Sequence, residues 1–113
     1  MKSKILALSK NDEFKNLLKK RKISNKYATI FFGNLDNKNN QKLNISFVTK
    51  KKIGSAVKRN KIKRRLRNIV NDAVKEMALK FNYSYLVIAK TTMLNNEYTN
   101  IKETLFQSFK KIK

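Results

Sequence analysis

The stretch from residue 56 to residue 67 constrains the fold of this 113-residue chain most strongly, because it combines a helical apolar pattern with a high density of positive charge. Ser55 is a suitable N-cap for a helix that we expect to continue to about Lys80. The apolar stripe of this helix consists of Ile62, Leu66, Ile69, Val70, Ala73 and Met77. At about 100° per residue, the cations of its first three turns occupy most of the circumference. Only Ile62 and Leu66 are left to attach that end to a core.

The distribution of positive charge indicates a nucleic-acid partner. The chain has 28 Lys and Arg against seven Asp and Glu, a net charge of +21. Lysine is the usual cation, yet four of the five arginines lie within nine residues, at positions 59, 64, 65 and 67. Guanidinium groups grip phosphate oxygens two at a time and stack on bases, which an ammonium cannot do. The clustering therefore favours a binding surface for phosphates.

Two other interpretations of the charged helix are open at this point. A solvated charged face normally carries anions at i,i+4 spacing, whereas the seven cations between residues 58 and 67 have none between them. A helix on an anionic membrane needs a wider apolar stripe than this basic end offers. Cations near a helix N-terminus are unfavourable by roughly 0.3–1 kcal/mol each, which is understandable if phosphates occupy that end.

The composition also excludes several kinds of chemistry. The chain contains no cysteine and no histidine, so disulfides, thiolate zinc sites, cysteine nucleophiles and imidazole bases are ruled out. No apolar run approaches the 18 residues typical of a membrane span, and we expect a cytoplasmic protein. Hydrolysis of a phosphodiester without histidine needs clustered carboxylates to hold metal ions. Only Asp12/Glu13 and Asp72/Glu76 are close in sequence, and both pairs are interpreted as structural, so we expect no catalytic residue and no metal site.

The remaining segments predict a single α+β domain over residues 1–113. Helices are expected over 11–20 and from residue 95 or 96 onward, and strands over 27–32, 43–49 and 85–90. The strand over 43–49 alternates apolar and polar residues, as in a half-buried strand. The asparagine-rich loop over 33–42 suits a hairpin between the first two strands.

Residues 51–67, Lys-Lys-Ile-Gly-Ser-Ala-Val-Lys-Arg-Asn-Lys-Ile-Lys-Arg-Arg-Leu-Arg, resemble the signature of the bacterial ribonuclease P protein subunit family. The segments 12–14 (Asp-Glu-Phe) and 86–90 (Leu-Val-Ile-Ala-Lys) match the family in order and spacing, so the resemblance covers nearly the whole chain. The family's Arg-Asn-Arg core reads Arg59-Asn60-Lys61 here.

The resemblance implies a fold and a division of labour. The fold is an α/β sandwich like ribosomal protein S5 domain 2, ordered α-β-β-(β)-α-β-α, with a left-handed βαβ crossover. The basic helix is implied to bind the catalytic RNA through Lys58, Arg59, Asn60, Lys61, Lys63, Arg64, Arg65 and Arg67. A cleft between the first helix and the sheet is implied to hold the 5′ leader of precursor tRNA through Phe14, Leu18, Phe32, Lys51, Lys52 and Lys90. The RNA subunit performs the Mg²⁺-assisted cleavage, so the protein is an accessory subunit.

The residue types alone leave alternatives. Phe14 and Phe32 are also suitable for core positions. Asn60 could contact RNA, orient a metal-bound water, or simply be an exposed residue of the helix. A structural RNA binder such as a ribosomal protein fits the charge and size, and a DNA-compacting protein is a more distant alternative. The spacing Lys-Lys-Ile-Gly-x-Ala-Val-Lys-Arg-Asn favours the ribonuclease P subunit, because neither alternative needs it.

Overall fold

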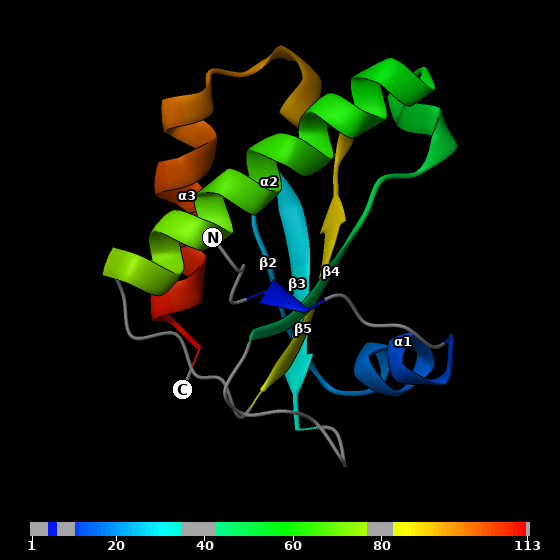
Figure 1. Cartoon of the computed structure of the whole chain (residues 1–113), viewed down its shortest axis with the longest axis vertical. Helices are drawn as coiled ribbons and strands as arrows, with labels where there is room; N and C mark the ends of the chain where they lie inside the picture. Colours follow the sequence, from blue (N-terminus) through cyan, green and yellow to red (C-terminus); the bar gives the residue numbers. More distant parts are fainter. Residues whose placement is uncertain (1–4, 7–10, 35–42, 77–82, 113) are drawn as a thin grey trace.

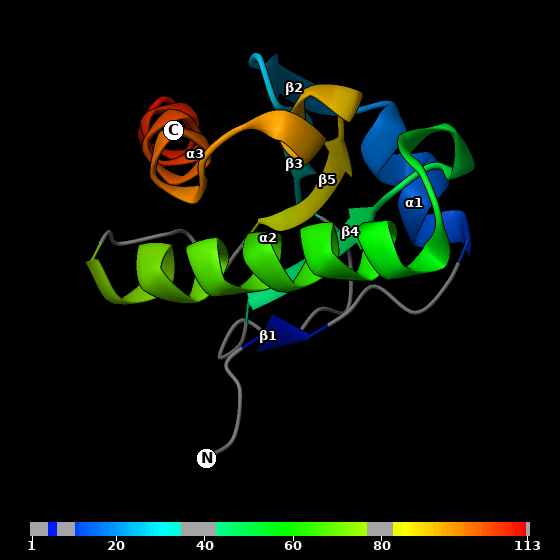
Figure 2. The ribbon, with the colours of Figure 1, turned by 90° about the horizontal axis from the view of Figure 1, so that it is seen from above.

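The computed structural model describes residues 5–6, 11–34, 43–76 and 83–112, with side chains from residue 15 onward in those ranges. Figure 1 shows a sheet with α2 and α3 on one face and α1 on the other, and the view from above in Figure 2 agrees. The elements follow in the order β1 (Ile5–Leu6), α1 (Asn11–Leu18), β2 (Arg21–Ser24), β3 (Ala28–Gly33), β4 (Leu43–Val48), the 3₁₀ helix η1 (Lys51–Ile53), α2 (Ala56–Glu76), β5 (Ser84–Ala89), the 3₁₀ helix η2 (Thr91–Asn95) and α3 (Tyr98–Lys110).

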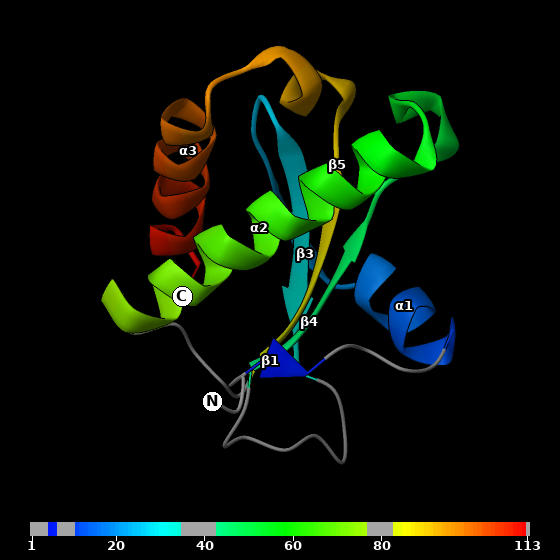
Figure 3. The same ribbon diagram turned by 45° about the horizontal axis from the view of Figure 1, so that its top comes forward.

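The five strands of the described ranges form one mixed sheet in the order β1-β4-β5-β3-β2. β4 and β5 are parallel neighbours, whereas β3 is antiparallel to both β5 and β2. α2 connects β4 to β5. Viewed from the α2 side with both strands pointing up, β5 lies to the left of β4, so the connection is left-handed (Figures 1 and 3). This handedness is rare among βαβ units, and it confirms what the family resemblance implied.

The main core lies between the sheet and the two helices α2 and α3. Leu43 and Ile45 of β4 are fully buried in it. The predicted apolar stripe of α2 is confirmed for Ile62, Leu66, Ile69, Val70 and Ala73, which are all buried, while Met77 lies outside the described residues. α3 adds Ile101, Leu105 and Phe109. These contacts bury the face of the sheet that carries the basic helix.

A second and smaller apolar cluster lies on the opposite face of the sheet, beneath α1. Leu17 of α1 and Leu86 of β5 are buried at its centre, at 0% and 2% exposure. Phe31, Val48 and Ile88 pack around them but remain partly exposed. This face is therefore covered incompletely, and an apolar surface remains open beside α1.

Several local predictions were wrong. The first helix ends at Leu18 and not near residue 20, because residues 21–24 form the edge strand β2 against β3. β3 and β4 do not form a hairpin, because β5 lies between them in the sheet. β4 does not alternate as a half-buried strand would, because its first four residues are buried on both faces of the sheet. Residues 35–42 of the expected hairpin loop and the expected helical turn up to residue 80 lie outside the described residues.

Candidate nucleic-acid interface

Gly54 and Ser55 determine where the basic helix begins. Gly54 has a φ of +151°, which residues with side chains rarely adopt, and its N–H donates to the Lys51 carbonyl at 3.1 Å to close η1. The Ser55 carbonyl then accepts the Arg59 N–H at 2.9 Å, and the Ser55 Oγ accepts the Lys58 N–H at 3.4 Å. Ser55 is therefore the N-cap of α2, as predicted.

The basic end of α2 projects beyond the main core. Its first fully buried side chain is Ile62, at 2% exposure, followed by Leu66 one turn later. Val57, in the first turn, is 78% exposed. The residues before Ile62 therefore hold their positions mainly through the continuity of the helix, which leaves most of their side chains available to a partner.

The cations of this end have no acidic partner within the protein as far as it is described. Lys102 of α3 forms the ion pairs of α2, with its Nζ 3.0 Å from Asp72 Oδ2 and 3.8 Å from Glu76 Oε2. Charge is thus segregated along α2. Its basic half, residues 56–67, carries cations without a carboxylate partner among the described residues, and its second half carries Asp72 and Glu76, which pair with Lys102. The residues expected to bind RNA are exposed (Lys58, Asn60, Lys61, Arg64, Arg67) or half-buried (Arg59, Lys63, Arg65).

The acidic half of α2 has a structural role. The hydrogen bond that Lys102 donates to Asp72 raises the pKa of the Lys102 ammonium above its usual value, and attraction to both carboxylates acts in the same direction against the effect of burial. The ion pairs join α3 to α2. The structural interpretation of Asp72 and Glu76 agrees with this arrangement.

Arg59 differs from the other cations in that one of its donors is buried. Its Nε is inaccessible to solvent, and no described residue accepts a hydrogen bond from it. A buried donor without a partner costs about 1–3 kcal/mol. A phosphate cannot reach this inaccessible Nε, so the half-buried Arg59 is available to RNA only through the accessible part of its guanidinium.

The apolar surface beside α1, where the resemblance implied a cleft, contains only some of the residues that were expected there. Leu18 is 48% exposed on α1, and Phe31, Val48 and Ile88 are partly exposed around the buried Leu17 and Leu86. Phe14 lies in α1, but its side chain is outside the described residues. Phe31 was missed by the sequence analysis. Strict alternation along β3 could have identified it, because a strand that buries Ile30 in the main core must turn Phe31 to the other face.

Phe32 does not belong to this surface. It is 4% exposed and belongs to the main core on the opposite face of the sheet. The Arg21 guanidinium lies 4.9 Å from the centre of its ring and donates a hydrogen bond to the Tyr83 hydroxyl at 2.9 Å. The geometry agrees with the core alternative for Phe32, because register in a strand turns adjacent residues to opposite faces.

The three lysines expected near the leader differ in their surroundings. Lys51 and Lys52 are exposed in η1, immediately before α2. Lys90 is half-buried, and its Nζ donates to Ser24 Oγ at 2.9 Å and to the Asn25 carbonyl at 2.6 Å. Because β4 and β5 are parallel, the segments that follow them leave the sheet at the same edge. The three lysines therefore belong to one end of the molecule, but Lys90 is already bonded to the β2–β3 turn.

The described residues contain no cluster of three or more acidic side chains that could hold a metal ion. They also contain no helix that is both long enough and apolar enough to span a lipid bilayer. The described residues place a basic helix on one face of the sheet and partly exposed apolar side chains on the other.

Comparison with known proteins identifies the family. A family model described as ribonuclease P matches residues 3–113. The chain is 34% identical over 110 residues to the ribonuclease P protein component of Carboxydothermus hydrogenoformans, covering 94% of this chain and 90% of the relative. It is 31% identical over 98 residues to the ribonuclease P protein component of Mesoplasma florum, covering 87% of this chain and 86% of the relative.

Solved structures show the same fold. The RNase P protein of Staphylococcus aureus matches with a TM-score of 0.78 at 24% identity, covering 92% of each chain. The RNase P protein from Thermotoga maritima matches with a TM-score of 0.77 at 21% identity, covering 96% of this chain and 98% of that chain. A ribosomal protein, the other function that the sequence left open, is not favoured by these matches. With a family model that spans almost its full length and relatives above 30% identity, the chain belongs to the ribonuclease P protein family.

Proposed function

We propose that this chain is the protein subunit of a ribonuclease P, that α2 binds the catalytic RNA, and that the apolar surface beside α1 binds the 5′ leader of precursor tRNA. The observation that carries the proposal is the basic half of α2. Its seven cations have no carboxylate partner among the described residues, and they are anchored by only two buried side chains, Ile62 and Leu66. Such a surface loses little internal stabilisation when it binds phosphates.

The chemistry of cleavage is assigned to the RNA subunit. Metal-assisted hydrolysis of a phosphodiester uses carboxylates or phosphates to hold Mg²⁺. Asp72 and Glu76 are engaged by Lys102 in the described structure, which supports RNA phosphates as the Mg²⁺ ligands. The protein would then act by screening phosphates and by holding the leader, which lowers the Mg²⁺ concentration needed for release of the leader and formation of a mature 5′ end. We expect this activity in the cytoplasm.

The leader is assigned to the apolar surface beside α1 because single-stranded RNA binds through apolar or aromatic surface together with nearby cations. Phe31 and Leu18 provide partly exposed apolar surface there, and Lys22 Nζ lies 5.9 Å from the centre of the Phe31 ring. Phe14, in the same helix, remains a predicted leader contact. Lys51 and Lys52 are exposed cations available for leader phosphates.

Reconstitution tests the proposal. The protein is mixed with its cognate RNA subunit and a precursor tRNA at a low Mg²⁺ concentration, and formation of mature 5′ ends is measured. We expect clear stimulation over RNA alone. Absence of stimulation, with RNA binding retained, would indicate a purely structural RNA-binding protein.

The salt dependence of RNA affinity tests the role of α2. If six or more phosphates are neutralised, log affinity should fall with log salt at a slope of about −4 or steeper. Arg64→Gln and Arg67→Gln, which change exposed residues of the basic half, should each reduce the slope by about 0.7–0.9. Lys75→Gln, at the other end of the same helix, is the matched control and should leave the slope unchanged. A slope near −1 in the unmodified protein would contradict the assignment.

A further inference from the structure

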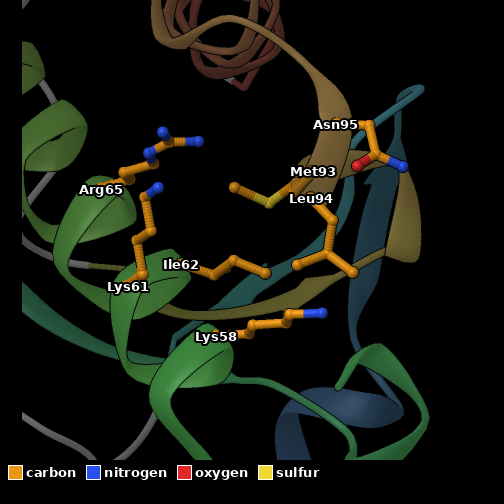
Figure 4. Close-up of a pocket in the computed structure, with 7 residues that line it drawn as sticks. All are labelled: Lys58, Lys61, Ile62, Arg65, Met93, Leu94 and Asn95. Atoms are coloured by element: carbon orange, nitrogen blue, oxygen red, sulfur yellow. The ribbon is translucent and has the colours of Figure 1, made fainter. Parts of the chain in front are cut away.

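A small pocket between the basic half of α2 and η2 has the chemistry to hold an RNA base. Its volume is about 180 Å³, below the roughly 300–1,000 Å³ of a pocket for a drug-sized ligand, so it suits a single planar group. Figure 4 shows Ile62 of α2 facing Met93 and Leu94 of η2 across it. Ile62 and Met93 are buried and Leu94 is partly exposed, so the floor of the pocket is apolar.

Cations surround this apolar floor. Lys61 and Arg65 place their charged groups beside each other at one side, and Lys58 lies at the other (Figure 4). Lys61 and Arg65 are four residues apart on one helix, an arrangement that destabilises a helix by about 0.2–0.5 kcal/mol when the charges are alike. No acidic residue lines the pocket. An anion at the rim would remove this repulsion.

Asn95 adds a polar group at the edge of the pocket. Its side chain is exposed, so its amide is accessible to a ligand. An amide carries both donors and an acceptor, which matches the mixed edge of a nucleobase. A phosphate alone would use the cations but would gain nothing from the apolar floor, and an acidic peptide without an aromatic side chain would have no planar face for it.

We propose that this pocket binds one unstacked base of single-stranded RNA, with the flanking phosphates on Lys58, Lys61 and Arg65. The inference rests on the proposed function, because it specifies how α2 contacts RNA. Leu94 is the partly exposed residue of the apolar floor and provides the face for the base, because Ile62 and Met93 are buried and the pocket has no aromatic side chain. The preferred RNA would then be a strand with a free base, and not a continuous duplex.

The experiment uses the full-length protein and two strands of equal charge. One is a ten-nucleotide oligouridylate, and the other is an abasic ribose-phosphate strand of the same length. Base stacking on protein is worth roughly 5-fold or more in affinity per base, and for an apolar floor without an aromatic ring we expect about 5-fold tighter binding of the oligouridylate. Leu94→Ala and Asn95→Ala should each bring the two affinities closer together while leaving the salt slope unchanged, because the cations remain.

Gln107→Ala is the matched control, since it removes an exposed amide from α3, away from the pocket. A second measurement needs no variant. The chain has three methionines, so the methyl resonance of Met93 can be assigned by isotopic labelling. It should shift when oligouridylate is added and should not shift with the abasic strand.

Equal affinity for the two strands, no measurable binding of either strand, or an unshifted Met93 resonance would overturn the inference. The low-Mg²⁺ cleavage assay is independent of this result. Stimulated cleavage together with equal affinities would reject the base pocket and keep the proposed function, whereas loss of both would reject the two together.

Discussion

Lys58→Glu is predicted to stabilise the free protein and to weaken its binding to RNA. Lys58 is exposed in the first turn of α2 and has no carboxylate partner among the described residues. Its N–H already bonds to Ser55 Oγ. A glutamate at this position completes the capping-box pattern Ser-x-x-Glu, in which the new carboxylate accepts the N–H of the cap residue.

The magnitude follows from the position in the helix. Removal of a cation from the N-terminal turn relieves about 0.3–1 kcal/mol, and addition of an anion there gains a similar amount. The expected increase in the free energy of unfolding is therefore about 1–2 kcal/mol at low ionic strength, and it should shrink as salt screens the exposed charges. RNA affinity should fall, and the salt slope should lose about 0.7–0.9 for the missing phosphate contact.

Urea unfolding at low and high salt measures the stability, and titration with the cognate RNA subunit measures the affinity. Lys75→Glu is the matched control, because it makes the same change of charge in the last turn of α2. At that end the loss of a cation and the gain of an anion are both unfavourable, so stability should decrease by about 1–2 kcal/mol. A loss of stability in Lys58→Glu would contradict the account of the helix end, and a gain in stability with unchanged RNA affinity would show that phosphates do not occupy that end.

Three further predictions concern the fold around the interface. Leu17→Ala should lower the free energy of unfolding by about 2–3 kcal/mol, which is the lower part of the range for a buried leucine because the residues around Leu17 are partly exposed. Leu18→Ala changes an exposed residue, so it should cost less than about 0.5 kcal/mol of stability but weaken binding of precursor tRNA relative to mature tRNA. Equal losses of stability in the two variants would contradict the assignment of Leu17 to the buried face and Leu18 to the exposed one. Gly54→Ala should cost about 1–3 kcal/mol in urea unfolding because of its φ of +151°, and a neutral result would show that the turn before α2 relaxes freely. Because the pKa of Lys102 is raised in the folded protein, its charged form should stabilise the fold fully at pH values below the usual lysine pKa, and this stabilisation should be lost as pH rises through the folded-state pKa. Lys102→Met should remove this loss of stability at alkaline pH, which thermal unfolding measured as a function of pH would show.

Patterns carried by a single element were predicted well from the sequence. The stripe from Ile62 to Ala73 is buried as its spacing required, and Ser55 caps α2 as expected. Both features depend on a local period or a local hydrogen bond. The position of the cations on α2 followed in the same way, because a helix fixes the directions of its side chains.

Features that depend on which strands become neighbours were not predictable from local patterns. The loop after β3 has the composition of a hairpin turn, but β5 pairs with both β3 and β4 and separates them. The family resemblance implied that Phe32 lines the leader cleft, whereas the alternation of side chains along β3 places Phe31 on the α1 face of the sheet and Phe32 in the main core. The pocket beside η2 was missed for a related reason, since Met93 and Ile62 are distant in sequence and meet only through tertiary packing.

The sheet topology explains why the candidate RNA contacts gather at one edge. β4 and β5 are parallel, so both end at the same edge of the sheet. The chain continues from β4 into η1 and the basic start of α2, and from β5 through Lys90 into η2. In open sheets, ligands bind beyond the carboxyl ends of parallel strands, where the connecting segments diverge. The left-handed crossover puts the basic start of α2 at this edge, where its cations have no carboxylate partner among the described residues, while Asp72 and Glu76 lie toward the other end and hold α3. One helix can therefore serve both the core and the RNA because its two halves carry different charges.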